Sequence, residues 1–378
     1  MSAPAPFVLV VSLQPLDAMT TLFFGHLVGQ VPEAIQVVRH GDPQLAAALA
    51  GASAIVLVRA LFELDSVIWS ARALRVPLYY FVDDNLMLLR EQPGAWSAFI
   101  GRYSTANVRA RLRRFCGVML SSPVLVEYFR VERLHHRLML FPPIQWRQRL
   151  SRPTPRREGV CVAFFGGLHL HDVFIRCVLP AVRRLAGEQP VTLIAAGVHE
   201  PIVPSHGLTV IKQPYDQSYA RGLQRLAEAG VDVLVHPSVA GLWNNQYKNP
   251  HALISADAIG AVPVVSDRPP YDQLRSEGVV LLCDDSVESW YAALAQTMRP
   301  DQRRPIQERL FAFCATHFSG SVNRPVVDEV LRLHAPPNTR WMWTRRGVVR
   351  ACLLLGRLRQ GGARVMRRLR LSAGSSGP

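Results

Sequence analysis

Short apolar runs rich in β-branched residues alternate along this chain with longer segments of helical character. Uninterrupted apolar runs of this length are typical of strands that are buried on both faces of a parallel sheet. We therefore predict an α/β fold. The predicted strands span residues 7–12, 35–39, 54–59, 78–83, 117–121, 138–141, 159–165, 191–196, 208–212, 231–236, 261–265 and 279–283.

A polar, basic segment with two prolines, residues 145–158, interrupts the alternation near its middle. This composition is typical of a linker. A chain of 378 residues is long for one core and comfortable for two. We predict a Rossmann-like domain over 1–144, a linker over 145–158, a second Rossmann-like domain over 159–330 and a separate tail over 331–378.

Residues 234–267 form the most informative segment, with the pattern strand, loop, helix, strand. We predict that Asn249 caps a helix that Pro250 opens and that ends near Gly260. Free amides at the start of this helix, with Lys248 just before them, would suit the phosphates of an anionic ligand. The alternative is an ordinary βαβ unit in which Lys248 is only a solvated charge.

Ligands of parallel sheets bind outside the carboxyl ends of the strands, so polar residues that follow a strand are candidates. Two such groups stand out beside the loop 244–249: Asp83-Asp84-Asn85, and the turn Gly166-Gly167 with His169 and His171 after it. Each could equally be a turn or a helix cap. The two histidines are not at a diagnostic metal-ligand spacing, and the six cysteines include no CxxC pair. We expect no metal site and no disulfide.

The positive charge of the chain is concentrated at its end. The net charge is +15, but eleven arginines and no acid follow residue 330, which leaves +4 for residues 1–330. A nearly neutral body makes nucleic acid an unlikely partner. No apolar run reaches the roughly 18 residues that span a bilayer, and the N-terminus enters the first strand without a leader. We expect a cytoplasmic protein that is soluble or peripheral to the inner membrane face.

The tail has the pattern of an amphipathic helix. At 100° per residue, one face carries Val348, Cys352, Leu355, Met366 and Leu369, and arginines occupy the other. This pattern predicts contact with an anionic membrane surface, although a helix packed on the body or an RNA-binding segment are alternatives. We expect Gly356, Gly361 and Gly362 to weaken or break the helix. The predicted membrane contacts are Trp341, Trp343, Arg346, Arg350 and Arg357.

Residues 50–330 resemble the GT-B-fold glycosyltransferases, particularly the bacterial, group 1-like members that build surface polysaccharides. The resemblance includes the strand that ends in Asp83-Asp84-Asn85, the glycine loop at Gly166-Gly167 and the Asn245-Gln-Tyr-Lys248-Asn-Pro segment before the donor-site helix. It implies two Rossmann-like domains that face each other across a cleft. Asp83 and Asp84 also resemble the metal-holding pair of GT-A enzymes, but that fold leaves the second half of the chain unexplained.

The resemblance implies transfer of a sugar from a nucleotide-sugar donor, held by the second domain, to a lipid-linked or polysaccharide acceptor at the first. No bound metal and no cofactor are expected, because positive charge and amide dipoles stabilise the leaving diphosphate. Asp84 is the first choice for an acceptor base and Asp83 the second. The candidate donor-binding residues are Gly166, Gly167, His171, Asn245, Lys248, Asn249, Ser255 and Asp267.

One departure from the family lies in the donor helix, where a glutamate commonly binds sugar or ribose hydroxyls. The matching position here is Ser255 or Ala256, and Asp257 points about 100 to 200° away from both. Two alternatives to an active transferase therefore stay open. One is a non-catalytic scaffold of a polysaccharide pathway, and the other is a sugar-nucleotide epimerase with the same two-domain fold.

Overall fold

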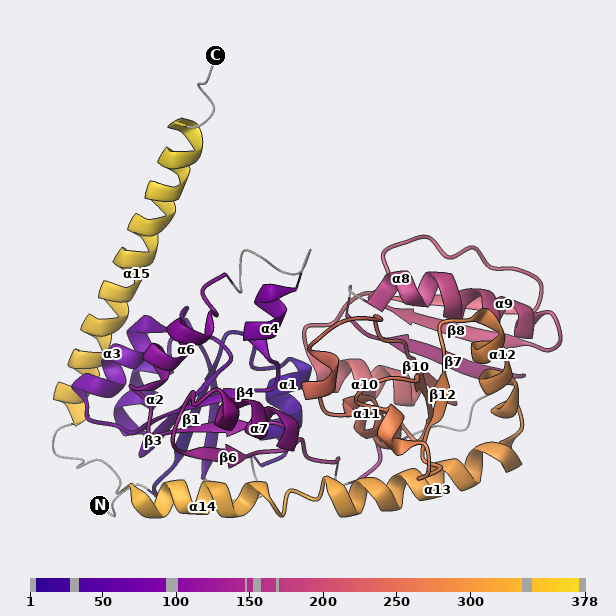
Figure 1. The fold of residues 1–378 in the computed structure, drawn as a ribbon, viewed down its shortest axis with the longest axis horizontal. Coiled ribbons are helices and arrows are strands. Elements are labelled where there is room, and N and C mark those ends of the chain that lie inside the picture. The colour runs from indigo at the N-terminus through magenta and orange to yellow at the C-terminus, as the bar shows by residue number, and fades with distance from the viewer. Residues whose placement is uncertain are drawn as a thin grey trace.

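A computed structural model describes residues 5–27, 34–92, 101–146, 148–151, 158–167, 170–334 and 342–373 of the chain, with side chains up to Leu358 in the last segment. These residues form two domains, each built on a parallel sheet, and a long C-terminal helix (Figure 1).

The sheet of the first domain has the strand order β2-β1-β3-β4-β5-β6, with all pairs parallel. Its strands are β1 (Val8–Ser12), β2 (Ile35–Arg39), β3 (Ala54–Val58), β4 (Leu78–Val82), β5 (Gly117–Leu120) and β6 (Leu138–Leu140). The helical segments between them are α1 (Ala18–Thr20), the π-helical turn η1 (Thr21–Gly25), α2 (Leu45–Gly51), α3 (Asp65–Ala73), α4 (Leu86–Glu91), α6 (Thr105–Leu112) and α7 (Pro123–Val131).

The second domain repeats this plan with the strand order β12-β11-β10-β7-β8-β9. Its strands are β7 (Val160–Phe165), β8 (Val191–Ala196), β9 (Leu208–Gln213), β10 (Val233–His236), β11 (Val262–Ser266) and β12 (Leu281–Cys283). Its helical segments are α8 (His171–Val173), η3 (Phe174–Val178), α9 (Leu179–Ala186), α10 (Tyr219–Glu228), η4 (Asn245–Tyr247), α11 (His251–Ile259), η5 (Asp272–Leu274), α12 (Val287–Gln296) and α13 (Pro300–His317).

The predicted α/β fold with two Rossmann-like sheets is confirmed. Each predicted apolar run coincides with a strand, and the bounds agree within two residues. The central strands β1, β3, β4 and β11 are buried at every position, which is why they appear in the sequence as continuous apolar runs.

The chain returns to the first domain after α13. Helix α14 (Asn323–Leu333) lies along the first sheet, beside α13 at the base of the molecule (Figure 1). Arg137 pairs with Glu329 at 2.7 Å, and the Asn323 side-chain amide donates to the carbonyl of Pro142 at 2.7 Å. The range that we predict for the second domain, 159–330, thus includes a helix that packs on the first.

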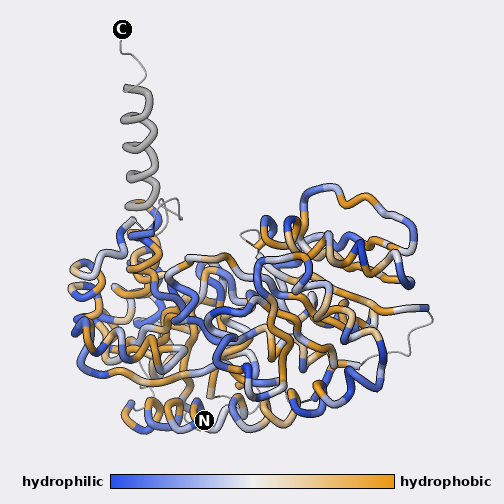
Figure 2. The backbone as a smooth tube through the Cα atoms, turned by 45° about the vertical axis from the view of Figure 1, so that its right-hand side comes forward, coloured by the Kyte–Doolittle hydropathy of each residue, from blue (hydrophilic) through white to orange (hydrophobic). Residues whose placement is uncertain are grey.

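Helix α15 (Met342–Ala373) packs its first half on α2 and α3 (Figures 1 and 2). Its second half extends away from the body (Figure 1). Val349 is fully buried there, and the Arg345 guanidinium donates to the carbonyl of Ala50 at 2.8 Å. The side of α15 that faces the body is therefore centred on Val349. Leu355, which belongs to the predicted apolar face, is 58% exposed and does not share this contact.

The three glycines do not break this helix, because α15 continues through Gly356, Gly361 and Gly362. Gly356 has a packing role instead. A Cβ atom on Gly356 would lie 2.5 Å from the Cβ of Ser66 on α3, so the missing side chain permits the close contact of the two helices.

Candidate functional site

A cavity of about 360 Å³ lies between the two domains. Its walls come from the loops that follow β1, β3 and β4 in the first domain, and from the loops after β7, β8, β9 and β10 together with α11 in the second. The carboxyl ends of both sheets therefore open into one space, which is the usual place for ligands of parallel sheets.

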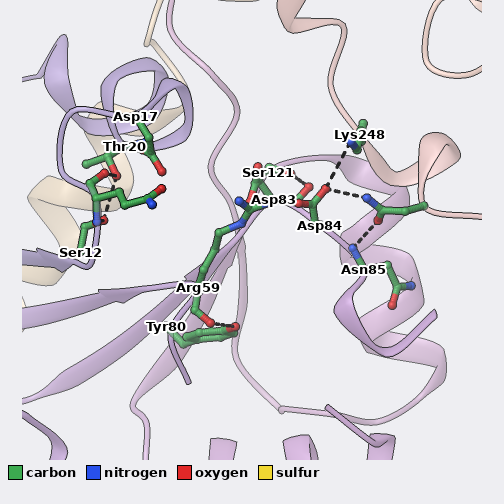
Figure 3. A network of polar contacts seen from close by, with 12 residues as sticks. Ser12, Asp17, Thr20, Arg59, Tyr80, Asp83, Asp84, Asn85, Ser121 and Lys248 are labelled. Carbon is green, nitrogen blue, oxygen red and sulfur yellow. Dashed lines mark hydrogen bonds and ion pairs between the residues drawn. The ribbon is translucent and has the colours of Figure 1, made fainter. Parts of the chain in front are cut away.

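The first-domain wall centres on Arg59, at the end of β3. Its Nε atom lies 2.8 Å from Asp83 Oδ1, and its Nη2 atom pairs with Asp84 (Figure 3). Arg59 has a φ of 57°, and its carbonyl accepts hydrogen bonds from the hydroxyls of Tyr80 (2.9 Å) and Tyr103 (2.7 Å). Two buried tyrosines thus fix a left-handed backbone that arginine rarely adopts, and they aim the guanidinium at the cavity.

Asp17 is a further carboxylate on this wall, in the loop after β1. It caps α1 by accepting a hydrogen bond from the amide of Thr20 at 2.7 Å. Burial raises the pKa of its carboxyl group above the ordinary value, although the Thr20 amide opposes this effect. The sequence analysis missed Asp17, yet the strand-end rule applied to the first predicted strand would have found it.

On the second-domain wall, Lys248 lies at the end of η4 with its Nζ atom 3.9 Å from Asp84 Oδ1. Burial, and then the nearby charge of Arg59, lowers the pKa of Lys248 to about 8. The ammonium group is therefore a partly desolvated cation that faces the cavity, as expected from the sequence.

The predicted helix cap is wrong. Helix α11 begins at His251 with Pro250 in the capping position, and its C-terminal cap is Gly260 with a φ of 66°, as predicted. The side-chain amide of Asn249 instead donates across the domain boundary to the carbonyl of Ser121 at 2.9 Å. Proline has no side-chain acceptor, so no side chain caps this helix.

Four other candidates of the second domain also line the cavity: Gly166, Gly167, Asn245 and Ser255. A Cβ atom on Gly166 would come within 2.8 Å of Leu170 and 3.1 Å of Phe164, so glycine permits the turn to pack tightly there. The Ser255 hydroxyl lies 2.5 Å from the hydroxyl of Tyr219. The structure thus brings these residues, Asn249 and Lys248 together with Asp83 and Asp84.

The structure does not bring His171 and Asp267 into the cavity. His171 is buried, with its ring 5.6 Å from that of Phe164 and its Nδ1 atom 3.5 Å from Glu200. Asp267 pairs with Arg275. Each of these two side chains is directed to a partner and is not part of the cavity wall. His169 lies outside the described residues.

Helix α11 presents no acid to the cavity. Asp257 is 1% exposed and faces the linker, where it accepts from Gln145 Nε2 at 2.7 Å and pairs with Arg149 at 3.1 Å. The expected direction of Asp257, away from Ser255, is therefore confirmed.

The loop after β9 contributes residues that the sequence analysis did not single out. Asp216 pairs with Arg221 at 2.9 Å and Arg225 at 3.2 Å. Hydrogen bonds from Arg221 and from the Ser218 amide lower the pKa of the Asp216 carboxyl group to about 2. Tyr215, which also lines the cavity, is 67% exposed. Among the described residues, no three His, Cys, Asp or Glu side chains lie close enough to hold a metal ion.

No protein-family model and no curated protein match this chain. Solved structures do. HepE from Anabaena, in complex with UDP and glucose, is 13% identical, with a TM-score of 0.53 over 86% of this chain and 99% of its own.

Sucrose-phosphate synthase from Thermosynechococcus elongatus is 13% identical, with a TM-score of 0.56 over 87% and 98% of the two chains. An alpha-glucosyltransferase in complex with UDP-glucose and DNA is 9% identical, with a TM-score of 0.55 over 86% and 99%. These similar structures are GT-B glycosyltransferases, and the chain has the GT-B fold.

Proposed function

We propose that this protein is a glycosyltransferase that moves a sugar from a nucleotide-sugar donor to an acceptor across the interdomain cavity. One observation carries the proposal: Lys248 and the Gly166-Gly167 turn of the second domain face the carboxylates of the first across a single space. The similar structures with UDP, glucose or UDP-glucose bound support a donor of this class.

The second domain is proposed to hold the donor. Lys248 would pair with the diphosphate, and the Gly166-Gly167 turn would let the phosphates approach the backbone closely. A cation already in place stabilises the charge that develops on the leaving diphosphate. Where water is excluded, this lowers the free energy of the transition state by about 3 kcal/mol. With this charge on the protein, we propose transfer without a bound metal or cofactor.

The acceptor side is proposed to use Asp17 as the base that takes a proton from an acceptor hydroxyl, with Asp83 as the second choice. The sequence alone favoured Asp84. However, Arg59, Asn244 and Lys248 engage both carboxylate oxygens of Asp84, which leaves it a poor proton acceptor. Burial raises the pKa of Asp17 toward the working range of a general base.

Calorimetry with a panel of nucleoside diphosphates tests the donor site, on the wild type and on Lys248→Ala. We expect one nucleotide to bind, at least about tenfold more weakly to the variant, and its sugar conjugate to be transferred or hydrolysed. Absence of binding to every nucleotide would support the scaffold alternative. Interconversion of free sugar nucleotides would support the epimerase.

We propose further that the protein works at the cytoplasmic membrane face on a lipid-linked or polysaccharide acceptor, with α15 as the membrane contact. Trp343, Leu354 and Leu358 lie on the side of α15 that faces away from the body, and they are 82%, 59% and 63% exposed. Arg346, Arg350 and Arg357 flank them along one edge of the helix, by the same spacing.

A helix with exposed apolar side chains beside arginines suits an anionic lipid surface. Trp341, the other predicted membrane contact, lies outside the described residues. In the part of the chain that the structure describes, none of the helices combines the length and apolar character required to cross a bilayer.

A further inference from the structure

Residues 241–249 form a loop that follows β10 in the second domain. Its polar groups nevertheless form hydrogen bonds with the first domain. Among the described residues, four hydrogen bonds of this loop cross the boundary at or below 2.9 Å: Asn85 N to Asn244 Oδ1 (2.6 Å), Asn244 Nδ2 to Asp84 Oδ1 (2.6 Å), Ser122 Oγ to Tyr247 O (2.7 Å) and Asn249 Nδ2 to Ser121 O (2.9 Å). We call this loop the clasp. It joins the carboxyl end of one sheet to the carboxyl ends of β4 and β5 in the other.

Asp84 is the charged centre of this boundary (Figure 3). The residue is 7% exposed, and its carboxylate pairs with Arg59, accepts from Asn244 Nδ2 at 2.6 Å and lies 3.9 Å from Lys248 Nζ. A buried carboxylate is stable only when its oxygens are paired or hydrogen-bonded, so these partners hold one another in place. Two of them, Asn244 and Lys248, belong to the clasp.

The same contacts fix the cation that faces the cavity. A lysine side chain is flexible, since its ammonium group lies at the end of a stem of four carbons. Here the backbone of Lys248 belongs to the clasp, and its Nζ atom lies 3.9 Å from Asp84 Oδ1 in the wall of the cavity. Its position therefore depends on a residue of the other domain.

We propose that Asp84 is a positioning residue: it docks the clasp on the first domain and so places Lys248 at the phosphate side of the cavity. Closure of the two domains and assembly of the anion site are then one event, because the same carboxylate holds both. The docking role stands by itself, whereas its consequence for nucleotide binding rests on the proposed function.

Hydrogen exchange of the full-length protein tests the docking role without any ligand. In Asp84→Ala we expect exchange at least about tenfold faster in peptides that cover residues 85–91 and 241–249. The clasp loses Asp84 as its partner, and its release takes Asn244, the acceptor of the Asn85 amide, away from the first domain. Asp65→Ala is the matched control: Asp65 pairs with Arg111 inside the first domain, so both peptides should keep the wild-type rate.

Asp84→Asn keeps the size of the side chain and an acceptor for Asn244, but removes the charge beside Lys248. Calorimetry with UDP should show weaker binding, and the pH above which UDP affinity falls should move down, because loss of a nearby anion lowers the pKa of an ammonium group. A purely structural role would not move this pH.

The proposal would be overturned if both peptides exchanged at the wild-type rate in Asp84→Ala and in Asp84→Asn. Unchanged UDP affinity in Asp84→Asn, combined with loss of sugar transfer alone, would also overturn it and identify Asp84 as a proton acceptor. If the wild type binds no UDP and no other nucleotide, the proposed function fails, while the exchange result still decides whether Asp84 docks the clasp.

Discussion

The surroundings of Lys248 lower the pKa of its ammonium group to about 8. Below that pH the ammonium form predominates and can pair with a phosphate; above it the charge is lost. We predict that UDP affinity falls as the pH rises past about 8, by up to about tenfold per pH unit. Calorimetry at a series of pH values on both sides of about 8 measures this change in UDP affinity.

Lys248→Arg should remove the decline, because a guanidinium keeps its charge throughout this range. A decline of the same size in Lys248→Arg would assign the pH dependence to another group.

The buried charge of Asp257 affects the stability of the fold and not the binding of a ligand. Asp257→Ala removes a carboxylate that binds both Gln145 and Arg149, and leaves the amide and the guanidinium without their acceptor. We predict a loss of about 2 to 4 kcal/mol in the free energy of unfolding, measured with denaturant.

Asp328→Ala is the control for this loss. Asp328 is 56% exposed and lies 3.9 Å from Arg324, so removal of its carboxylate should change the free energy of unfolding by less than about 0.5 kcal/mol. Equal losses in the two variants would show that the burial of Asp257 has no energetic role.

The sequence predicted those site residues that a single loop after a strand reveals, but not their partners from other parts of the chain. Lys248 and Asp83 follow buried strands, and that local signal placed both correctly. The partners of Asp84, Arg59 and Asn244, could not be predicted because they are distant in sequence, and only the fold shows that they share one carboxylate. Asp267 follows a strand too, but Arg275 turns its side chain elsewhere.

Among the elements, α15 makes its closest described approach to α3 at a glycine, Gly356. We predict that Gly356→Leu forces α15 away from α3, because even a Cβ atom would lie 2.5 Å from the Ser66 Cβ. Limited proteolysis should then cut the helix at least about tenfold faster than in the wild type.

Gly347→Leu is the matched control on the same helix. A Cβ atom at Gly347 meets nothing within 4 Å, so this variant should resist protease as the wild type does. Equal sensitivity of the two variants would mean that Gly356 has no special place in the packing of α15.

Strands were predicted more accurately than helix ends, for a physical reason. The central strands are buried on both faces, so their whole length is apolar and their ends are visible in the sequence. The start of α11 depends instead on a contact between distant parts of the chain. Asn249 Nδ2 donates to the carbonyl of Ser121 in the other domain, and among the described residues no side-chain oxygen accepts from the first amides of the helix.

At the scale of the whole molecule, the positive tail and the nearly neutral body predict a protein that associates with membranes through one end. Deletion of residues 338–378 should abolish co-sedimentation with anionic vesicles, while neutral vesicles should bind neither form. Sedimentation of the deleted form equal to that of the full chain would exclude the tail as the membrane contact. A loss with anionic and neutral vesicles alike would point to apolar contact alone.

The return of α14 to the first domain has a topological consequence. The chain crosses between the domains twice, and the crossings touch, since the Gln145 amide donates to the carbonyl of Phe318 at 2.7 Å. A cut in the first crossing would therefore not release two independent pieces, because the fragment that carries the second sheet would still hold α14 against the first. The two domains are therefore tethered at two adjacent points of the chain, and both tethers would have to be cut to separate them.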